Sequence, residues 1–451
     1  MNTPIWDFLL RYRRETPARF HMPGHKGVPG PLGCEPWDIT EVLGADALYE
    51  ASGIIAESEA NAASLFGSGS TFYSTGGSSQ CVRAMLYLAL MNRPAGTPPV
   101  IAAARNVHKA FIYAAALLDF ETVWLWPEAE TTSLCACPVA PEGLEQALAA
   151  LDAPPAAVYI TSPDYLGNMA DVKGLAEVCH RRETILAVDN AHGAYLRFLD
   201  HSLHPLDLGA DLCCDSAHKT LPVLTGGAYL HTAKNLPAAF RENAKAALAL
   251  FGSTSPSYLT LASLDLCNRY LAEEGPYRIR EAAGRMAALK ESLPLWGWTL
   301  SGTEPLKLTL DAAAYGLTGS LAAECLRMDG GIEPEYADRD DVVLMASGST
   351  DGESFRAVEN ALRGMAAKRP IPRPVLPLAK GERILSVREA VFAPHESIPV
   401  KESLGRICGA PAVSCPPAIP IAAAGERIGP AALALFGHYG IERVEVLREK
   451  E

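Results

Sequence analysis

The sequence predicts an α/β protein whose large domain is built on a mostly parallel sheet and is followed by smaller α+β domains. One observation is that short β-branched or apolar runs alternate with Ala- and Leu-rich helical stretches until about residue 290. A second is the composition, because 49% hydrophobic and 20% charged residues can bury large cores and argue against disorder. A length of 451 residues suggests two or three domains of roughly 100–200 residues each. We expect a major domain over residues 1–290, a small α+β domain over 291–368 and a C-terminal domain over 369–451.

The major domain contains the alternating elements. Each expected strand leads into a helix and the chain then returns to the next strand, which is typical of parallel sheets covered by helices. The expected strands are Val100–Ala103, Thr122–Trp126, Ala157–Thr161, Ile185–Asp189, Asp211–Asp215 and Gly227–His231. The expected helices are Ser79–Met91, Pro141–Leu151 and Val172–Arg182, with a helix-rich stretch from Ala233 onward.

The composition changes beyond residue 290. Leu308–Thr318 and Asp341–Ala346 are predicted strands on either side of a helix at Ser320–Met328, which would make a small α+β unit. The segment Lys368–Pro377 is dense in proline, and proline removes backbone donors and fixes φ, so we expect an extended linker there.

The charge balance excludes one class of partner. The chain has 39 Lys+Arg against 52 Asp+Glu, a formal net charge of −13, and no basic run. Nucleic-acid binding draws most of its affinity from Lys and Arg, so no nucleic-acid partner is expected. Charges at Asp7, Arg11 and Arg13 interrupt the N-terminal apolar residues and argue against a signal peptide or a membrane span. We expect a cytoplasmic protein without a membrane partner.

The cysteines indicate a reducing compartment. None of the eleven cysteines forms a C-x-x-C pair, and several, such as Cys213 and Cys214, lie inside apolar runs. We expect ordinary reduced thiols rather than disulfides or a zinc site.

Lys219 is the first candidate for chemistry. It lies in the segment DLCCDSAHKTLPVLTGGAYL, directly after an apolar strand. Most lysines are solvated surface residues, but a lysine at the end of a buried strand is poorly placed for that. Burial disfavours the ammonium form and makes the amine available to form a Schiff base with an aldehyde.

Asp189 ends another apolar strand, in the segment ILAVDNAHGAY. A carboxylate at the carboxyl end of a parallel strand points into the crevice where α/β sheets bind ligands, although it could equally cap the next turn. Together with Lys219 it fits a pyridoxal 5′-phosphate (PLP) site, where a carboxylate keeps the pyridine nitrogen protonated.

A Gly-Ser loop precedes both residues. The segment Ser74–Gln80, STGGSSQ, opens a predicted helix, so backbone N–H groups, hydroxyls and the positive end of the helix dipole could bind a phosphate. The loop is neither a P-loop nor a G-x-G-x-x-G motif. A phosphate loop, a strand-end Asp and a strand-end Lys, in that order, indicate an aspartate-aminotransferase-like PLP-dependent large domain.

These segments carry a resemblance to a known family. The chain resembles the bacterial ornithine/lysine/arginine decarboxylases, in a short form without their N-terminal wing domain. The matching segments are RFHMPGHKG (19–27), DITEVLGAD (38–46), RNVHK (105–109), TSPDYLG (161–167), VDNAHGA, SAHKTLPVLTGGA, STSPSY (253–258) and the tail PPAIPIAAAGERI (416–428).

The resemblance implies a function and a set of residue roles. The protein would be a lyase that uses PLP to decarboxylate arginine, lysine or ornithine to the corresponding amine, feeding polyamine synthesis. Lys219 would bind the cofactor aldehyde, Asp189 would pair with the pyridine nitrogen, and His108 would stack on the ring. His192 is implied as a further catalytic and cofactor-binding residue. The residues implied to bind the cofactor phosphate are Gly76, Gly77, Ser78, Ser79, Ser216 and His218.

The same resemblance implies a homodimer or a higher homo-oligomer. Ser253 and Thr254 would reach into the site of the neighbouring subunit, so each site would need two chains. A cationic substrate needs acidic partners. The candidates for that role, each also readable as an ordinary solvated carboxylate, are Glu41, Asp46, Glu333, Glu335, Asp338 and Glu426.

Three positions depart from the family pattern. Asn190 stands where the family usually has Glu, Ala217 where it usually has Thr, and Gly77 where it usually has Ser. The two lost hydroxyls could each remove one hydrogen bond worth about 0.5–1.5 kcal/mol. Two alternatives therefore stay open, another PLP-dependent aminotransferase or lyase, and a weakly active paralogue that binds cofactor or polyamine.

A catalytic metal is not expected. His21 and His25 are separated by Pro23 and Gly24, which argue for a loop rather than a helix. His201 and His204 have no carboxylate or thiolate partner at metal-ligand spacing apart from Asp207.

Overall fold

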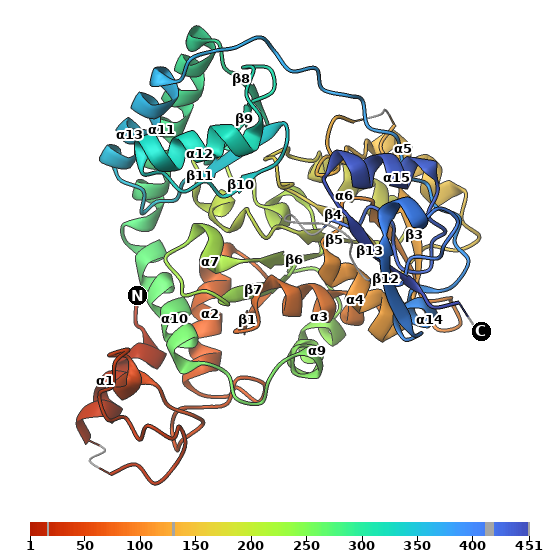
Figure 1. The fold of residues 1–451 in the computed structure, drawn as a ribbon. Coiled ribbons are helices and arrows are strands. Elements are labelled where there is room, and N and C mark those ends of the chain that lie inside the picture. The colour runs from red at the N-terminus through yellow and green to blue at the C-terminus, as the bar shows by residue number, and fades with distance from the viewer. Residues whose placement is uncertain (16–17, 129–130, 411–418, 450–451) are drawn as a thin grey trace. The chain divides into compact units, whose positions relative to one another are not determined.

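The chain forms two compact units in a computed structural model that describes residues 1–15, 18–128, 131–410 and 419–449 (Figure 1). The first unit consists of Met1–Pro94 and Ile185–Arg280, and the second of Ala95–Thr184 and Glu281–Glu451. Each unit therefore combines two separate stretches of chain. The expected domains 1–290, 291–368 and 369–451 stay a prediction.

The described residues of the first unit form four strands in the order β1-β7-β6-β5. They are β1 (Ser70–Ser74), β5 (Ile185–Asp189), β6 (Leu212–Asp215) and β7 (Ala228–Thr232). Strands β5 and β6 are parallel, whereas β7 runs antiparallel to both β6 and β1. The sequence did not predict β1, because the short run STFYS lies between Gly-Ser segments that are typical of loops.

Helices cover these strands. Helix α3 contacts all four strands of the first unit, and its buried Ala, Leu and Met side chains explain why it packs there. The helices of this unit are α1 (Pro4–Glu15), α2 (Ile54–Phe66), α3 (Gly77–Met91), α7 (Ala217–Thr220), α8 (Ala238–Glu242), α9 (Ala244–Phe251) and α10 (Tyr258–Ala272), and α11 (Gly275–Ser292) leads out of it. The helix-rich stretch expected after Ala233 is confirmed.

The second unit contains a parallel set of strands and two smaller sheets. The parallel strands are β2 (Val100–Ala104), β3 (Glu121–Leu125) and β4 (Ala157–Thr161), in the order β4-β2-β3. Their connecting helices are α4 (Lys109–Leu118), α5 (Pro141–Ala149) and α6 (Val172–Arg181). The predicted α/β class with mostly parallel pairing is confirmed.

The smaller sheets of this unit are antiparallel. One has the order β10-β11-β9-β8, from β8 (Thr299–Ser301), β9 (Lys307–Asp311), β10 (Tyr336–Ala337) and β11 (Asp341–Met345), with helices α12 (Gly319–Gly330) and α13 (Gly352–Gly364). The other pairs β12 (His395–Pro399) with β13 (Arg443–Leu447), next to α14 (Val387–Val391) and α15 (Pro430–His438).

Two features of the predicted C-terminal half differ in outcome. The strand expected over Leu308–Thr318 was wrong beyond Asp311, because the chain turns there and Gly316 adopts a φ of +86°. The Pro-rich segment 368–377 contains no helix or regular strand, as expected for a linker, and makes one isolated bridge from Leu376 to Thr131.

Two general expectations can be compared with the structure. All cysteines among the described residues are free thiols, as predicted, and Cys415 lies outside those residues. No helix in the described part of the chain combines the length and apolar character needed to cross a membrane.

Helix α1 begins on a buried carboxylate. Asp265 of α10 accepts hydrogen bonds from the backbone N–H groups of Ile5 (2.9 Å) and Trp6 (3.0 Å), which have no partner within their own helix. Ser58 of α2 donates its hydroxyl to the other oxygen of Asp265. Burial raises the pKa of Asp265 from 3.8 to about 6. One acidic group therefore joins three helices.

Replacing Asp265 by Asn should change the pH dependence of stability. The folded protein holds the Asp265 proton more tightly than the unfolded chain, so the wild-type free energy of unfolding falls as pH rises from about 4 through about 6. The difference between wild type and Asp265→Asn should change by on the order of 2–3 kcal/mol over that range. Urea unfolding at several pH values measures it. Glu353→Gln, at an exposed position in α13, is the control. If the free energy of unfolding depended on pH equally in both variants, the assignment would be contradicted.

Candidate active site

The loop between β1 and α3 has an unusual backbone. Gly77 adopts a φ of +70°, and a Cβ added there would meet nothing within 4 Å. Its N–H donates to the carbonyl of Gly226 (2.8 Å), which ties the two glycine-containing loops together. The glycine is therefore required by the backbone angle and not by crowding.

Gln80 holds this loop in place from the first turns of α3. Its side-chain oxygen accepts hydrogen bonds from the Ser74 hydroxyl (2.6 Å) and the Gly76 N–H (3.2 Å). Its amide nitrogen donates to the Tyr49 hydroxyl (2.9 Å) and the Leu248 carbonyl (2.8 Å). Sequence reasoning missed this role, although a Gln in the helix after a Gly-Ser loop was a visible signal.

The hydroxyl of Ser78, in the first turn of α3, meets the hydroxyl of Ser216, which follows β6. The Ser216 hydroxyl donates to the Ser78 hydroxyl (2.8 Å), although the two residues are far apart in sequence. Because the first N–H groups of a helix lack intrahelical partners, α3 adds backbone donors and a positive dipole end beside these hydroxyls. The arrangement suits an anion such as a phosphate group.

Asp189 lies at the carboxyl end of β5, as predicted, and is buried. One carboxylate oxygen accepts from the N–H of Ala191 (3.2 Å) and from the thiol of Cys214 (3.6 Å). Burial, with added repulsion from Asp189, raises the pKa of the Cys214 thiol well above its usual value, so that thiol stays a donor. These contacts hold the carboxylate at the strand end.

Lys219 lies in the short helix α7 after β6. Its Nζ is 2.9 Å from Nε2 of His192, a residue that follows the end of β5. A turn closed by the Gly193 N–H and the Asn190 carbonyl (2.8 Å) carries His192. The structure thus brings together Lys219 and His192, both predicted from the sequence, and either ring tautomer could exchange a proton with the amine.

The remaining predicted residues have different surroundings. His218 lies beside Lys219, and its Nδ1 is 2.9 Å from the Gly227 carbonyl. Ser253 and Thr254 are exposed in the loop after α9. His108 belongs to the second unit, where it follows β2 and its Nδ1 accepts from the Ala110 N–H (3.1 Å). These geometries leave the roles of the four residues as predictions.

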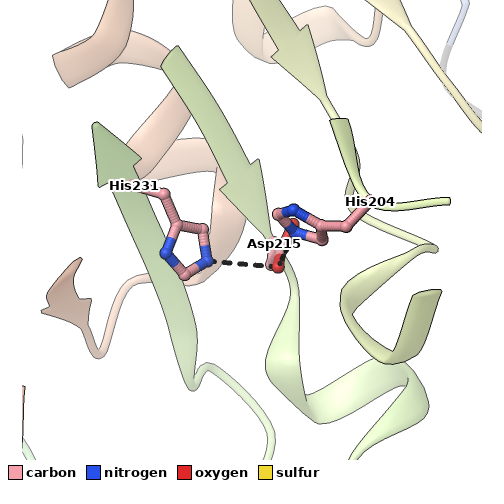
Figure 2. A group of neighbouring side chains, drawn as sticks. All are labelled: His204, Asp215 and His231. Atoms are coloured by element: carbon pink, nitrogen blue, oxygen red, sulfur yellow. Dashed lines mark hydrogen bonds and ion pairs between the residues drawn. The ribbon is translucent and has the colours of Figure 1, made fainter. Parts of the chain in front are cut away.

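A buried cluster joins His204, Asp215 and His231, which the sequence analysis did not group (Figure 2). Both Nε2 atoms lie near one oxygen of Asp215, at 3.0 Å for His204 and 3.2 Å for His231. The spacing would admit a metal ion, but the Leu206 N–H donates to Nδ1 of His204 (3.4 Å), which places the His204 proton on Nε2. The contacts therefore indicate a hydrogen-bonded cluster rather than a metal site.

Most of the acidic candidates are engaged elsewhere. Asp46 accepts four backbone N–H groups, two of them at the start of α2 and two from the segment before it. Asp338 accepts those of Asp340 and Asp341. Glu426 is buried, and its carboxylate lies 3.5 Å from the guanidinium of Arg105.

The other three carboxylates are less buried. Glu333 pairs with Arg327, and Glu335 accepts from the Tyr165 hydroxyl. Glu41 is exposed and accepts a hydrogen bond from the adjacent Thr40 hydroxyl. Of the six carboxylates it is the one least engaged with other parts of the chain, and it stays a candidate for binding a cationic substrate.

The fold and this donor set define a PLP-dependent enzyme of the aspartate aminotransferase fold. Its α3 N-terminus and serine hydroxyls suit the phosphate, while Asp189 and Lys219 suit the pyridine nitrogen and the aldehyde. An SPT variant solved with PLP has a similar fold, with a TM-score of 0.55 at 14% identity over 71% of this chain and 79% of that chain.

Further comparisons identify the family. The profile described as "Orn/Lys/Arg decarboxylase, major domain" matches residues 3–308. A protein of Halalkalibacterium halodurans named arginine decarboxylase is 30% identical over 96% of this chain and 92% of its own length. The constitutive lysine decarboxylase of E. coli has a similar fold, with a TM-score of 0.77 at 18% identity over 99% of this chain and 82% of that chain.

The chain belongs to the Orn/Lys/Arg decarboxylase family, as its motifs predicted. It is a PLP-dependent decarboxylase. In the tail motif, residues 416–418 lie outside the described residues, and the rest contributes the buried side chains of Ile421 and Ile428 to the core of the C-terminal segment.

Removing the paired hydroxyls should weaken cofactor binding. Ser78→Ala and Ser216→Ala should each lower the affinity for PLP by about two- to tenfold, because each removes one hydrogen bond. The double variant should lose less than the product of the two, since the two hydroxyls bond to each other. PLP titration of the cofactor-free protein measures this. Ser320→Ala in α12 is the control, and unchanged affinity in both single variants would remove the serines from the phosphate site.

Proposed function

We propose that this protein decarboxylates arginine and releases CO2 and the corresponding amine. The observation that carries the proposal is the 2.9 Å contact between Lys219 Nζ and His192 Nε2, beside a helix N-terminus bordered by Ser78 and Ser216. The similar protein that covers almost all of this chain is named arginine decarboxylase, which favours arginine over lysine and ornithine.

Each residue has a task in this proposal. PLP, when bound, supplies an aldehyde for an amine and a ring that accepts the electrons of the bond to the leaving CO2. The α3 N-terminus with Ser78, Ser79 and Ser216 would hold the phosphate, and Asp189 would pair with the pyridine nitrogen. His192 would take a proton from Lys219 Nζ or return one to it across their 2.9 Å contact.

Further tasks rest on the family resemblance. His108 would stack its imidazole on the pyridine ring of PLP. The hydrogen bond from the Ala110 N–H to its Nδ1 fixes the orientation of the imidazole. Gly76 and Gly77 would let the phosphate approach the backbone. His218 would border the phosphate site.

We propose that the protein acts in the cytoplasm, where its amine product would supply polyamine synthesis.

Arginine should release CO2 in the presence of the protein and PLP. We expect arginine to show the highest kcat/KM in a panel with lysine and ornithine, measured as CO2 release. Lys219→Ala should lose both turnover and the absorbance band that forms when the lysine amine condenses with PLP. Lys234→Ala, an exposed lysine after β7, is the matched control and should keep both.

The alternative functions give different outcomes in the same assay. An aminotransferase would yield a 2-oxo acid without CO2, and a weakly active paralogue would form the absorbance band without turnover. A Lys219→Ala protein that kept the band would overturn the assignment of the lysine itself.

We also propose that the active form is a homodimer or a larger homo-oligomer. Ser253 and Thr254 are exposed, so their side chains are available to a second chain. Large apolar side chains in the segment 20–43 are also strongly exposed, including Phe20 (98%), Leu32 (82%) and Leu43 (99%). Exposed apolar groups gathered in one segment favour a protein partner.

Mixed dimers should test whether Ser253 and Thr254 act in the partner's site. A Ser253→Ala/Thr254→Ala chain keeps its own Lys219, and a Lys219→Ala chain keeps both hydroxyls. A dimer of the two should contain one complete site and show about half of the wild-type turnover, well above that of either parent. Differently tagged chains expressed together allow this dimer to be isolated and assayed. Turnover no higher than that of the parents would show that the hydroxyls do not serve the partner.

A further inference from the structure

Asn190 and Asp215 connect the ends of the two strands that carry the site. The Asn190 N–H donates to the Cys214 carbonyl (3.0 Å), which extends the parallel pairing of β5 and β6 past Asp189. Its side-chain amide donates to Oδ1 of Asp215 (2.8 Å), so a side-chain hydrogen bond joins the two strand ends beyond the last backbone hydrogen bond. Both residues are completely buried.

Asp215 is held as an anion. Its second oxygen, Oδ2, accepts from His204 and His231, and its first oxygen also accepts from the Cys213 thiol (3.6 Å). Burial alone would raise the pKa of Asp215, but the two histidines outweigh it and hold that pKa below its usual value. Four donors therefore surround one buried carboxylate, and Figure 2 shows the two that are histidines.

The cluster extends across the strands of the first unit. His231 of β7 contacts the Thr71 hydroxyl of β1 through its Nδ1 (2.8 Å). His231 pairs with Cys213 in the β6-β7 register, and Asp215 lies two residues further on, so all three side chains share one face. Asp189 pairs with Cys214, whose side chain points to the opposite face.

The anion determines how the Asn190 amide is oriented. With the amide reversed, its oxygen would meet the negative Asp215, so the nitrogen faces Asp215. The oxygen then lies over Gly193, where an added Cβ would collide with it. Gly193 closes the turn that contains His192. The shape of this turn therefore depends on both the amide and the carboxylate.

We infer that Asn190 and Asp215 are positioning residues that set His192 against Lys219 by fixing the turn after β5. The inference deepens the proposed function and rests on it for the role of Lys219. Neither residue contacts the reacting atoms in this arrangement. Asn190 donates to a buried anion, and a second carboxylate at position 190 would repel it.

The test uses the reactivity of Lys219 in the cofactor-free protein, which needs neither PLP nor arginine. The rate at which a small amine-reactive acylating reagent labels Lys219 is measured by peptide mass spectrometry. We expect Asn190→Asp to change that rate at least threefold, in the same direction as His192→Ala. In a His192→Ala background, Asn190→Asp should change it less than twofold, because the positioned group is already absent.

A swapped pair provides the rescue. In Asn190→Asp/Asp215→Asn the amide and the carboxylate exchange places. The oxygen of the relocated amide can accept from the histidines and its nitrogen can donate to the relocated carboxylate, so the contact is rebuilt with the same net charge. The labelling rate should return to within about twofold of wild type. Asp215→Asn alone, which removes the anion without introducing a second carboxylate, serves if Asn190→Asp fails to fold.

Two outcomes would overturn the inference. An equal effect of Asn190→Asp with and without His192 would show a direct charge effect on Lys219 instead of positioning. A swapped pair that folds but labels like Asn190→Asp would show that the contact does not matter. A lack of CO2 release from arginine would overturn the proposed substrate alone, since the labelling experiment does not involve it.

Discussion

The structure of the site depends on the parallel pairing of β5 with β6. That register places Asp189 opposite Cys214. The turn that follows β5 and the short helix that follows β6 then bring His192 and Lys219 into contact. Side chains alternate between the two faces of a strand, so a shift of one residue would move every side chain to the other face. Both strands are apolar and almost entirely buried, which strongly specifies one register. The placement of Asp189 and Lys219 after two neighbouring strands is thus a consequence of strand register.

Much of the fold and part of the site could be predicted from the sequence. The strand ending at Asp189 and the strand before Lys219 were predicted within a residue, because continuous apolar runs bounded by polar residues are a local signal. Strand β1 was missed, since five residues between Gly-Ser segments carry little periodicity. Gln80 and the His204–Asp215–His231 cluster were missed because their partners are distant in sequence and meet only after the strands have paired.

The departures from the family pattern have different physical meanings. Gly77 occupies a left-handed backbone angle in open space, so its missing side chain leaves a well-formed loop. Ala217 is buried at the start of α7, where a hydroxyl would need its own partner. Asn190 faces a buried carboxylate and supplies a donor to it. The neutral amide of Asn190 is therefore matched to the negative charge of Asp215, which a Glu at position 190 would repel.

The contact of Asp265 with the first turn of α1 also bears on the order in which the chain assembles during synthesis. Residues 5 and 6 are synthesised 260 and 259 residues before their partner, Asp265. Strands β5, β6 and β7, which pair in the same unit, also follow a long intervening segment. Helix α1 therefore gains its contact with Asp265 only after that long segment has been synthesised, and the first unit cannot close before then.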